Sequence, residues 1–501
     1  MINHAAQRVF LGLGVEDRKD INQMPAFLCF NSRVPHESGI RGCQSSLTEK
    51  LVAQSTKSYD MEIIGARAGI CTRVHGSAVR CIAALPPVQR LPTPEAPLKT
   101  LCRSRWVLEA LDGMFISIQP PTRGMPDISS RYEGLGVGFA PYLQPPGPEV
   151  VRWTVGEPGF DTPSEIIEAA IKGLEQGNTK YTRGPGSMEL CQAVSDYLAK
   201  HHSIEVEAED VVITPGAKQA LLYSFMITTM PGDEAILLAP SWASYEPMLE
   251  LIGAVPVNVP VRKDNFHPDL DAIRAAVTEK TRMILVNSPC NPTGAVFTPA
   301  ELQEIVDIAV EHDLWIVSDE IYARLVWMDY PHVSPYALTG GSERTLIVNG
   351  WSKSWAMTGM RLGFLTGPSD AMGAAMKSQA NSASHVPTFL MHAAAVALDC
   401  DDSVEEFNRE YLKRREIMTE GLSEIPGLRV VEPEGAFYVF VDVTGTGMTD
   451  IEFADGALEA GVQLIPTSLI TGGEGFVRIS YATDEEAIHE GLRRLRAWLV
   501  D

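Results

Sequence analysis

The sequence predicts an α/β protein, in which a three-layer sandwich is built around a mostly parallel sheet and a smaller α/β domain completes the chain. Apolar, strand-like runs alternate with helical patterns through the middle of the chain, and this β-α-β order gives a parallel sheet with helices on both faces. Short strands and helices return near the C-terminus, after a long helical region. With 501 residues, 45% of them hydrophobic and 21% charged, the chain has the length and composition of a globular protein of two or three domains.

The elements around the large sheet follow from the period of the apolar residues and from the turn residues between them. Two helices come first, over 163–174 and 187–201, and the first carries Glu165 at its start, where a negative charge is favourable. Strands are then predicted over 211–214, 234–238, 282–286, 314–317 and 345–348. The connecting helices are predicted over 217–230, 245–252 and 299–312, with one short helix directly after 317.

The remainder of the chain predicts how the domains divide. Long helices are expected over 369–398, with a break at Pro387, and over 402–424; the last part has strands over 428–431, 436–443, 462–466 and 476–481 and helices over 449–460 and 484–499. We therefore assign residues 166–370 to a large domain, and residues 125–165 together with 371–501 to a small domain. Residues 1–124, where proline-rich pieces interrupt every period, are predicted to be a poorly structured extension.

Charge and cysteine usage exclude several classes of protein. The formal net charge of −23 argues against nucleic acid as a partner, because phosphate binding needs a basic face. The longest nearly apolar run, 386–398, is too short to span a bilayer, so no membrane segment is expected. The eight cysteines show neither CxxC nor zinc-finger spacing, which predicts no metal site and no disulfide framework. Free thiols fit a reducing compartment, and a cytoplasmic protein is expected.

Polar and aromatic residues follow the first two predicted strands of the sheet. Ligands of open α/β sheets bind beyond the carboxyl ends of the strands. After the first strand, Gly216, Ala217 and Lys218 form a turn that opens a helix, and the free N–H groups of a helix start favour a phosphate. After the second strand comes Trp242, whose flat side chain can stack on a heteroaromatic ring.

The next two strands end in residues of a similar kind. Asn291 lies in Asn287-Ser-Pro-Cys-Asn-Pro-Thr-Gly294, a tight turn that two prolines and a glycine define. Asp319 ends the following strand, with Tyr322 three residues later. A carboxylate in this place can keep a ring nitrogen protonated. A metal ion is the weaker alternative, since no histidine or further acid lies at ligand spacing.

A lysine follows the fifth strand, in Ser352-Lys-Ser-Trp-Ala-Met-Thr-Gly-Met-Arg361. A lysine amine is normally protonated, and it becomes a nucleophile only when its surroundings lower its pKa. A strand end that delivers Lys353 into a partly buried pocket, with Arg361 nearby to hold an anion, would have that effect.

In this order, the five loops resemble those of the fold-type I pyridoxal-phosphate-dependent aminotransferases of class I/II, the aspartate aminotransferase family. The resemblance runs from about Gly156 to the C-terminus. It implies pyridoxal 5′-phosphate as the cofactor, with Lys353 as its covalent attachment and proton-transfer group and Asp319 on the ring nitrogen. It also implies the other cofactor contacts: Asn291 and Tyr322 at the phenolic oxygen, Trp242 over the ring, Gly216, Ala217, Lys218 and Arg361 around the phosphate, and Ser352 beside the lysine.

Three further residues match the family. Tyr181 matches the tyrosine that reaches the phosphate of the neighbouring subunit, which implies a homodimer. Arg478 matches the arginine that binds the substrate α-carboxylate with both ends of its fork, a task for which lysine is a poor substitute. Gly156 matches the glycine whose backbone approaches that carboxylate. The substrate contacts implied are therefore Gly156, Lys218, Trp242, Asn291 and Arg478.

The resemblance implies an aminotransferase (EC 2.6.1.-) that moves an amino group between an L-amino acid and a 2-oxo acid such as 2-oxoglutarate. Lys218 stands where some aspartate aminotransferases of this branch place a lysine that meets the distal carboxylate, which favours aspartate-like substrates. Aromatic or alanine-type broad-range transaminases and a fold-type I lyase or synthase are the alternatives, and a 2-oxo acid product separates the lyases from transaminases. A transcription regulator of this fold would need a basic helix-turn-helix before it, and residues 1–124 show no such helical period.

Overall fold

The computed structural model describes residues 147–500 throughout, and before them residues 129, 132, 135, 136 and 139–144 and the backbone of residues 61–66 and 69–74. The chain divides into two compact units, Met1–Ile128 and Ser129–Asp501. In the first unit, β1 (Met61–Ala66) and β2 (Gly69–Val74) pair as antiparallel strands. The rest of the predicted extension over 1–124 lies outside the described residues.

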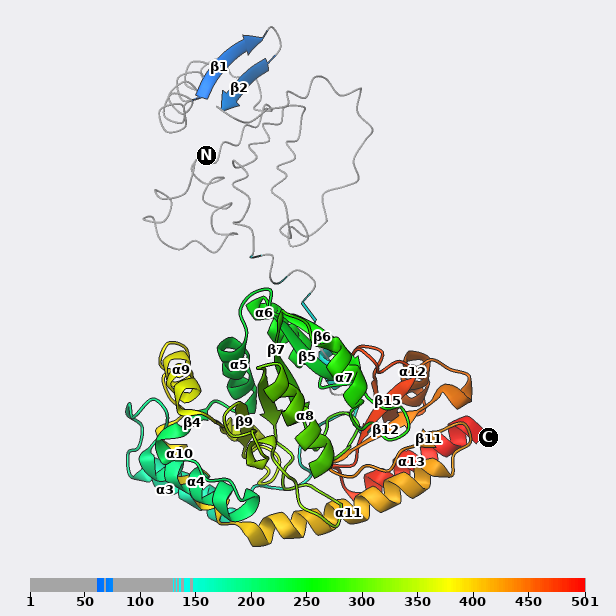
Figure 1. Ribbon diagram of the computed structural model, residues 1–501. Coiled ribbons are helices and arrows are strands. Elements are labelled where there is room, and N and C mark those ends of the chain that lie inside the picture. Colours follow the sequence, from blue (N-terminus) through cyan, green and yellow to red (C-terminus); the bar gives the residue numbers. More distant parts are fainter. Residues whose placement is uncertain are drawn as a thin grey trace, which may run out of the picture. The chain divides into compact units, whose positions relative to one another are not determined.

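A seven-stranded sheet forms the centre of the second unit (Figure 1). Its strands lie in the order β4-β10-β9-β8-β7-β5-β6, and all are parallel except β10, which runs antiparallel to both neighbours. The prediction of a mostly parallel sheet is confirmed. In chain order the strands are β4 (Val211–Thr214), β5 (Glu234–Ala239), β6 (Val255–Pro260), β7 (Thr281–Asn287), β8 (Trp315–Asp319), β9 (Thr345–Gly350) and β10 (Gly363–Thr366).

Helices cover both faces of this sheet, because successive residues of each buried strand point to opposite sides. In β7, Leu285 packs in one core cluster and its neighbour Ile284 in another; Val317 and Ile316 of β8 divide in the same way. The helices that follow the strands are α5 (Ala217–Thr228), α6 (Tyr245–Ile252), α7 (Leu270–Ala276), α8 (Pro299–Glu311) and α9 (Ser369–Ala380). The three-layer sandwich is thus confirmed.

The short helix predicted directly after 317 is wrong. The chain turns there instead, with backbone bonds from Ala323 to Glu320 and from Leu325 to Tyr322. The next residues bond to a distant part of the chain, since Ala436 N–H donates to the Leu325 carbonyl at 2.8 Å. Hydrogen bonds to a distant segment therefore stabilise the turn at this point in preference to the helix that the local pattern predicts.

A smaller α/β part lies at the C-terminal end. Its four-stranded antiparallel sheet has the order β11 (Arg429–Val430), β12 (Tyr438–Asp442), β15 (Phe476–Ser480) and β14 (Ile465–Pro466). The single strand predicted over 462–466 forms two pieces instead, because β13 (Val462–Gln463) pairs with β3 (Val151–Arg152) while β14 joins β15. The helices of this part are α11 (Asp401–Ser423), α12 (Asp450–Glu459) and α13 (Glu485–Val500).

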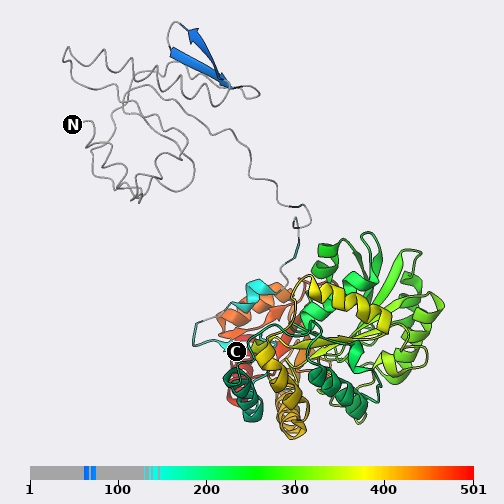
Figure 2. The same ribbon diagram turned by 90° about the vertical axis from the view of Figure 1, so that its left-hand side faces the viewer.

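Helix α10 (Thr388–Leu398) packs beside two helices that come much earlier in the chain, α3 (Ser164–Glu175) and α4 (Met188–His202) (Figures 1 and 2). Helices α3 and α10 approach closely at Gly173, where a Cβ atom would lie 2.4 Å from the Phe389 carbonyl oxygen. Residues of α10 and Ile213 of β4 belong to the same core cluster, so an apolar core joins this group of helices to the large sheet. The division of the chain at residue 370 stays a prediction.

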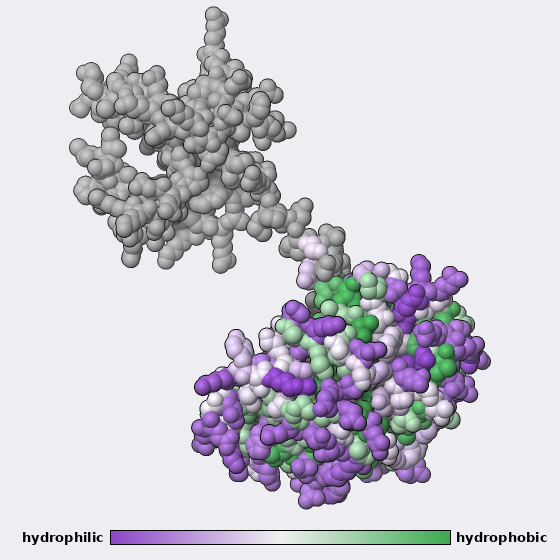
Figure 3. All heavy atoms as spheres, turned by 60° about the vertical axis from the view of Figure 1, so that its left-hand side comes forward, coloured by the Kyte–Doolittle hydropathy of each residue, from purple (hydrophilic) through white to green (hydrophobic). Residues whose placement is uncertain are grey.

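The surface of this unit is mixed. On the face shown in Figure 3, hydrophilic residues predominate and hydrophobic residues occur in small groups. Among the helices that the structure describes, none has the length and apolar content that crossing a bilayer requires.

Candidate active site

Asp319 lies at the carboxyl end of β8, in the middle of the large sheet. Its buried carboxylate accepts a hydrogen bond from the Tyr245 hydroxyl, 2.7 Å from Oδ2, and another from the backbone N–H of Ile321, 3.3 Å from Oδ1. Burial raises the pKa of Asp319 to about 6, although the two hydrogen bonds act in the opposite direction. The carboxylate is therefore held in one orientation, in surroundings where a positively charged partner would stabilise it.

Lys353 follows β9, the strand next to β8. Its Nζ donates a hydrogen bond to the carbonyl oxygen of Gly156 and lies 5.7 Å from the ring centroid of Phe437. Burial, and next to it the positive charge of Arg478, lowers the pKa of Lys353 to about 8. A substantial fraction of this amine is neutral near physiological pH, as a nucleophilic lysine requires.

This lowered pKa predicts how the reactivity of Lys353 depends on pH. Only the neutral amine reacts with an acylating reagent, and its fraction rises as the pH passes the pKa. In the apoprotein, acylation of Lys353 should reach half of its maximal rate near pH 8. Lys413 is the control, because its ion pair with Glu485 raises its pKa above the ordinary lysine value. Labelling over a series of pH values, read by mass spectrometry of peptides, tests the difference; equal midpoints would contradict it.

Arg478 lies on β15 and is buried. Its guanidinium donates to the Asn291 side-chain oxygen at 3.0 Å and to the Thr154 carbonyl at 2.9 Å. Its Nε has no hydrogen-bond partner among the described residues, and within them no carboxylate forms an ion pair with it. Burial lowers the pKa of Arg478, which means that the isolated charge is costly here. A carboxylate from a ligand would remove this cost.

The start of α5 meets Arg361. Gly216 precedes α5 with φ +81°, and a Cβ atom there would lie 2.5 Å from the Arg361 guanidinium. Arg361 itself has φ +55° and its Nη1 donates to the Thr358 carbonyl at 2.9 Å. A phosphate would find its hydrogen-bond donors here, in the N–H groups at the start of α5, in the glycine turn before it and in the Arg361 guanidinium.

Lys218 and Trp242 lie beside this helix start. The Lys218 Nζ is 4.7 Å from the Trp242 ring centroid and 3.3 Å from the Ser244 hydroxyl. Burial, and then the charge of Arg361, lowers the pKa of Lys218. Trp242 packs edge-on against Tyr245, with ring centroids 5.3 Å apart, and Tyr245 is the partner of Asp319. The tryptophan is thus adjacent to the residues at the ends of β4 and β8.

Tyr322 and Gly156 lie near Lys353. The Lys353 Nζ is 6.0 Å from the Tyr322 ring centroid, and the Tyr322 hydroxyl lies 2.9 Å from the hydroxyl of Tyr438. Gly156 packs directly against that second hydroxyl, since a Cβ atom on it would lie 2.2 Å from the Tyr438 oxygen. Ser352, one residue before the lysine, is buried.

Tyr181 is the predicted site residue that its own chain leaves most exposed, at 92%. Its ring contacts His385 edge-on, with centroids 5.6 Å apart. No group of three or more metal-binding side chains occurs within the part of the chain that the structure describes.

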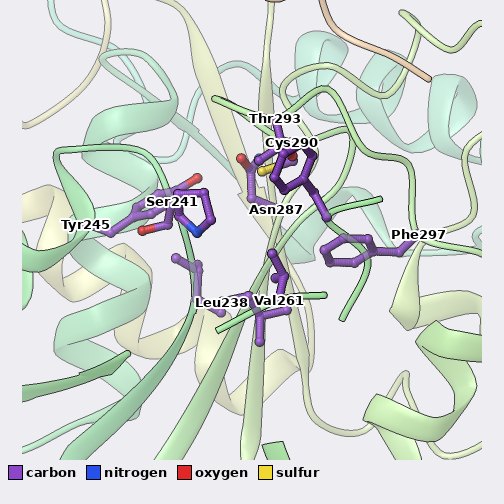
Figure 4. A pocket seen from close by; sticks show the side chains of 11 residues that line it. Leu238, Ser241, Tyr245, Val261, Asn287, Cys290, Thr293 and Phe297 are labelled. Carbon is purple, nitrogen blue, oxygen red and sulfur yellow. The ribbon is translucent and has the colours of Figure 1, made fainter. Parts of the chain in front are cut away.

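A small pocket is lined by Tyr245, Asn287 and Cys290 among others (Figure 4). Its volume of about 10 Å³ is space for about one water molecule. Burial raises the pKa of the Cys290 thiol, so that the neutral side chain packs against its apolar neighbours. The pocket is too small for a cofactor or a substrate.

Three residues at the site do not figure in the sequence analysis as site residues: Tyr245, Thr154 and Tyr438. Tyr245 could have been found, because it ends the same loop as Trp242. Thr154 and Tyr438 follow no motif, and their contacts join parts of the chain that are far apart in sequence.

The chain is similar to known proteins over most of its length. The family model described as "Aminotransferase class I and II" matches residues 148–495. The chain is 42% identical over 354 residues to an aspartate aminotransferase of Pyrococcus abyssi, covering 69% of this chain and 91% of that one. It is 40% identical over 359 residues to aromatic-amino-acid aminotransferase 2 of Thermococcus litoralis, covering 70% and 92%.

Solved structures are similar as well. The aspartate aminotransferase from Thermus thermophilus with maleate has a TM-score of 0.72 at 37% identity, covering 75% of this chain and 100% of that chain. The aromatic aminotransferase from Pyrococcus horikoshii has a TM-score of 0.68 at 41% identity, covering 70% and 95%. Because the family model spans more than half of the chain and these relatives match over nearly their full length, this protein belongs to the class I and II aminotransferases and is an aminotransferase of fold type I.

Proposed function

We propose that this aminotransferase binds pyridoxal 5′-phosphate at the ends of the large sheet, with Lys353 as its covalent attachment. When bound, the cofactor supplies an aldehyde that accepts the amino group and an electron-withdrawing pyridine ring. The observation that supports this most is that Asp319 ends β8 and Lys353 follows the neighbouring strand β9. The pKa of the lysine is lowered to about 8, and the acid is buried. The two groups have the chemistry that each end of the cofactor ring requires.

Lys353 would also move the proton at the substrate Cα, because its neutral amine is a base near pH 8. Asp319 would hold a proton on the ring nitrogen, since a buried carboxylate favours a cation beside it. The Asn291 oxygen already accepts from Arg478, which leaves its amide N–H groups to donate to the phenolic oxygen of the cofactor. Tyr322 would be the second donor to that oxygen.

The other cofactor contacts that we propose lie around these four residues. The phosphate would be held by the N–H groups of the α5 start, the turn before it and the two basic side chains nearby: Gly216, Ala217, Lys218, Arg361 and, beside the lysine, Ser352. Trp242 would cover the ring.

For the substrate we propose an L-amino acid of the aspartate type, with 2-oxoglutarate as the amino acceptor. Arg478 would bind the α-carboxylate, with Gly156, Trp242 and Asn291 around it, because its buried guanidinium lacks an anionic partner in the described chain. Lys218 would meet the distal carboxylate. The name of the Pyrococcus abyssi relative supports this choice, whereas that of the Thermococcus litoralis relative supports aromatic substrates as the second candidate.

Lys218→Ala tests the choice of substrate. If Lys218 meets the distal carboxylate, kcat/KM for aspartate should fall about tenfold, since a charged contact at a partly exposed position contributes less than the roughly 1.5–3 kcal/mol of a buried one. Both reactions are measured with saturating pyridoxal 5′-phosphate, so that a weaker phosphate contact of Lys218 limits neither, and the kcat/KM for alanine should then change less than about twofold. Lys377→Ala, on the exposed side of α9, is the matched control. An equal loss for both amino acids would contradict the role.

Identification of the products distinguishes a transaminase from a lyase or synthase of the same fold. A transaminase converts the amino acid to its 2-oxo acid and 2-oxoglutarate to glutamate in equal amounts. A lyase or synthase of the same fold would consume the amino acid without forming glutamate.

We also propose that the functional unit is a homodimer. Tyr181 is 92% exposed, although the family resemblance gives it a phosphate to bind, and a second chain would supply that phosphate. Helix α3 supports the proposal, because Ile167, Ile171 and Leu174 are between 41% and 52% exposed and recur at helical spacing. Such an apolar stripe is typical of a surface that another chain covers.

Mixed dimers test the role of Tyr181. Lys353→Ala and a bulky replacement, Tyr181→Trp, should each give an inactive or weakened protein. After subunit exchange, each hybrid dimer contains one site with both native residues, so activity should return to about half that of a native dimer at best. The control is a mixture of Lys353→Ala with a variant that carries both Lys353→Ala and Tyr181→Trp. No dimer in this mixture has a native lysine, so no complete site can form. Proven exchange without recovery would mean that Tyr181 does not serve the neighbouring chain.

A further inference from the structure

We infer that Tyr438 is a positioning residue of this active site, whose hydroxyl orients Tyr322 and whose ring supports Arg478. The inference rests on the proposed function, because it assigns Tyr438 a part in the use of the cofactor and of the substrate carboxylate. No motif of the sequence points to Tyr438, and the assignment comes from its contacts alone.

The ring of Tyr438 lies against Arg478. Tyr438 is the first residue of β12, is 1% exposed, and stands beside β15, the strand that carries Arg478. The guanidinium carbon of Arg478 is 4.5 Å from the Tyr438 ring centroid, which is the geometry of a cation–π contact. This contact stabilises a buried cation that has no carboxylate partner in the described chain. The ring thereby keeps the guanidinium in place while the substrate site is empty.

The hydroxyl of Tyr438 lies against two other site residues. It is 2.9 Å from the hydroxyl of Tyr322. It also leaves no room for a side chain at residue 156, because a Cβ atom there would lie 2.2 Å from the Tyr438 oxygen. The carbonyl of Gly156 in turn accepts the hydrogen bond of Lys353. Tyr438 therefore contacts Tyr322, proposed for the phenolic oxygen, and Arg478, proposed for the α-carboxylate. It reaches the catalytic lysine only through Gly156.

The direction of the hydroxyl bond follows from the proposed function. Burial raises the pKa of Tyr322 and of Tyr438, so both hydroxyls keep their protons and one of them donates to the other. If Tyr322 donates its proton to the phenolic oxygen of the cofactor, the Tyr322 oxygen is left to accept from Tyr438. Donation by Tyr438 polarises the Tyr322 O–H and strengthens the bond that Tyr322 gives. The effect favours negative charge on the phenolic oxygen.

Two replacements separate the hydroxyl from the ring. Tyr438→Phe removes the hydroxyl alone. The pH midpoint at which the visible absorption of the holoenzyme changes should then rise by about 0.5–1 pH unit, because the high-pH form of the cofactor depends most on stabilisation of its negative phenolic oxygen. Its KM for the amino acid should stay within about twofold of the native value. Tyr438→Leu also removes the ring, and its KM should rise about 3- to 30-fold as Arg478 loses the nearer of two ring contacts, the other being to Phe139 at 5.0 Å.

A double-mutant cycle shows whether the hydroxyl acts through Tyr322. In the Tyr322→Phe background, adding Tyr438→Phe should move the absorption midpoint by less than about 0.2 pH unit, because the bond that Tyr438 strengthens is already absent. Additive shifts would overturn the inference. Tyr411→Phe is the matched control, since Tyr411 is equally buried and packs on the same Phe437 from α11. Its absorption midpoint should equal that of the native enzyme.

The outcomes also distinguish this inference from the proposed function. A native protein without any Lys353-dependent visible absorption would overturn the proposed cofactor, and the inference with it. A native protein with that absorption, whose Tyr438→Phe variant titrates at the native pH and whose Tyr438→Leu variant keeps the native KM, would overturn the inference alone. Thermal unfolding of each holoenzyme variant checks that the comparison is made on folded protein.

Discussion

Lys353→Ala is expected to abolish both the visible absorption of the holoenzyme and its transamination. Alanine has no nitrogen, so the covalent bond to the cofactor cannot form and the base at the substrate Cα is lost with it. Proton transfer by a placed side chain alone contributes about 10²–10⁴-fold. Since Lys353 is asked to supply the attachment as well, turnover should fall more than about 10³-fold. Absorption spectra, turnover and the mass of the borohydride-reduced protein measure the loss.

The control for this change is Lys413→Ala, which removes an exposed lysine of α11 that pairs with Glu485. It should keep the native spectrum and turnover. The fold of Lys353→Ala should survive, because the Nζ hydrogen bond to Gly156 and two ring contacts are the chief interactions that the replacement removes. A variant that still forms a reducible adduct and still transaminates would show that another lysine carries the cofactor.

Arg478→Ala is expected to lower kcat/KM for amino acids by about 10²–10⁴-fold. The guanidinium can give a carboxylate two charged hydrogen bonds, each worth about 1.5–3 kcal/mol, and every 1.4 kcal/mol is about tenfold. Arg478→Lys should recover only a small part of this loss, because an ammonium group cannot reproduce the fork. Steady-state kinetics with aspartate and 2-oxoglutarate give both numbers.

The substrate itself provides a control for Arg478. An amine that lacks the α-carboxylate should react equally slowly with the native enzyme and with Arg478→Ala, since the missing contact is one that it cannot make. Arg429→Ala, an exposed arginine of β11 that pairs with Asp442, should leave kcat/KM unchanged. If Arg478→Ala slows the carboxylate-free amine as strongly as aspartate, then Arg478 supports the fold of the site rather than the substrate.

The local pattern of apolar and turn residues was sufficient to predict most strands of the large sheet. The strand over 211–214 is as predicted, since all four of its residues are buried and form a continuous apolar run. Two strands were missed. In β6, prolines at 256 and 260 interrupt the pattern, and β10 begins at Gly363, directly after the lysine stretch. Both strands pair because neighbouring strands offer them hydrogen bonds, which no local pattern records.

The order of the loops determined the family and the candidate residues. Residues such as Asp319 and Lys353 stand at strand ends that are visible in the sequence, and parallel strands bring their carboxyl ends to the same edge of the sheet. Residues that follow neighbouring parallel strands in the sequence are therefore expected to lie near one another in the fold.

The residues that surround Asp319, Tyr322 and Arg478 could be identified only from the tertiary structure. Tyr245 reaches Asp319 across 74 residues of the chain, Tyr438 reaches Tyr322 across 116, and Arg478 reaches Thr154 across 324. Such contacts arise when elements far apart in the chain pack together, and the periodicity of a single element carries no information about the element that it will meet. The identity of the reacting residues is therefore local information, whereas their pKa values and orientation depend on packing between distant parts of the chain.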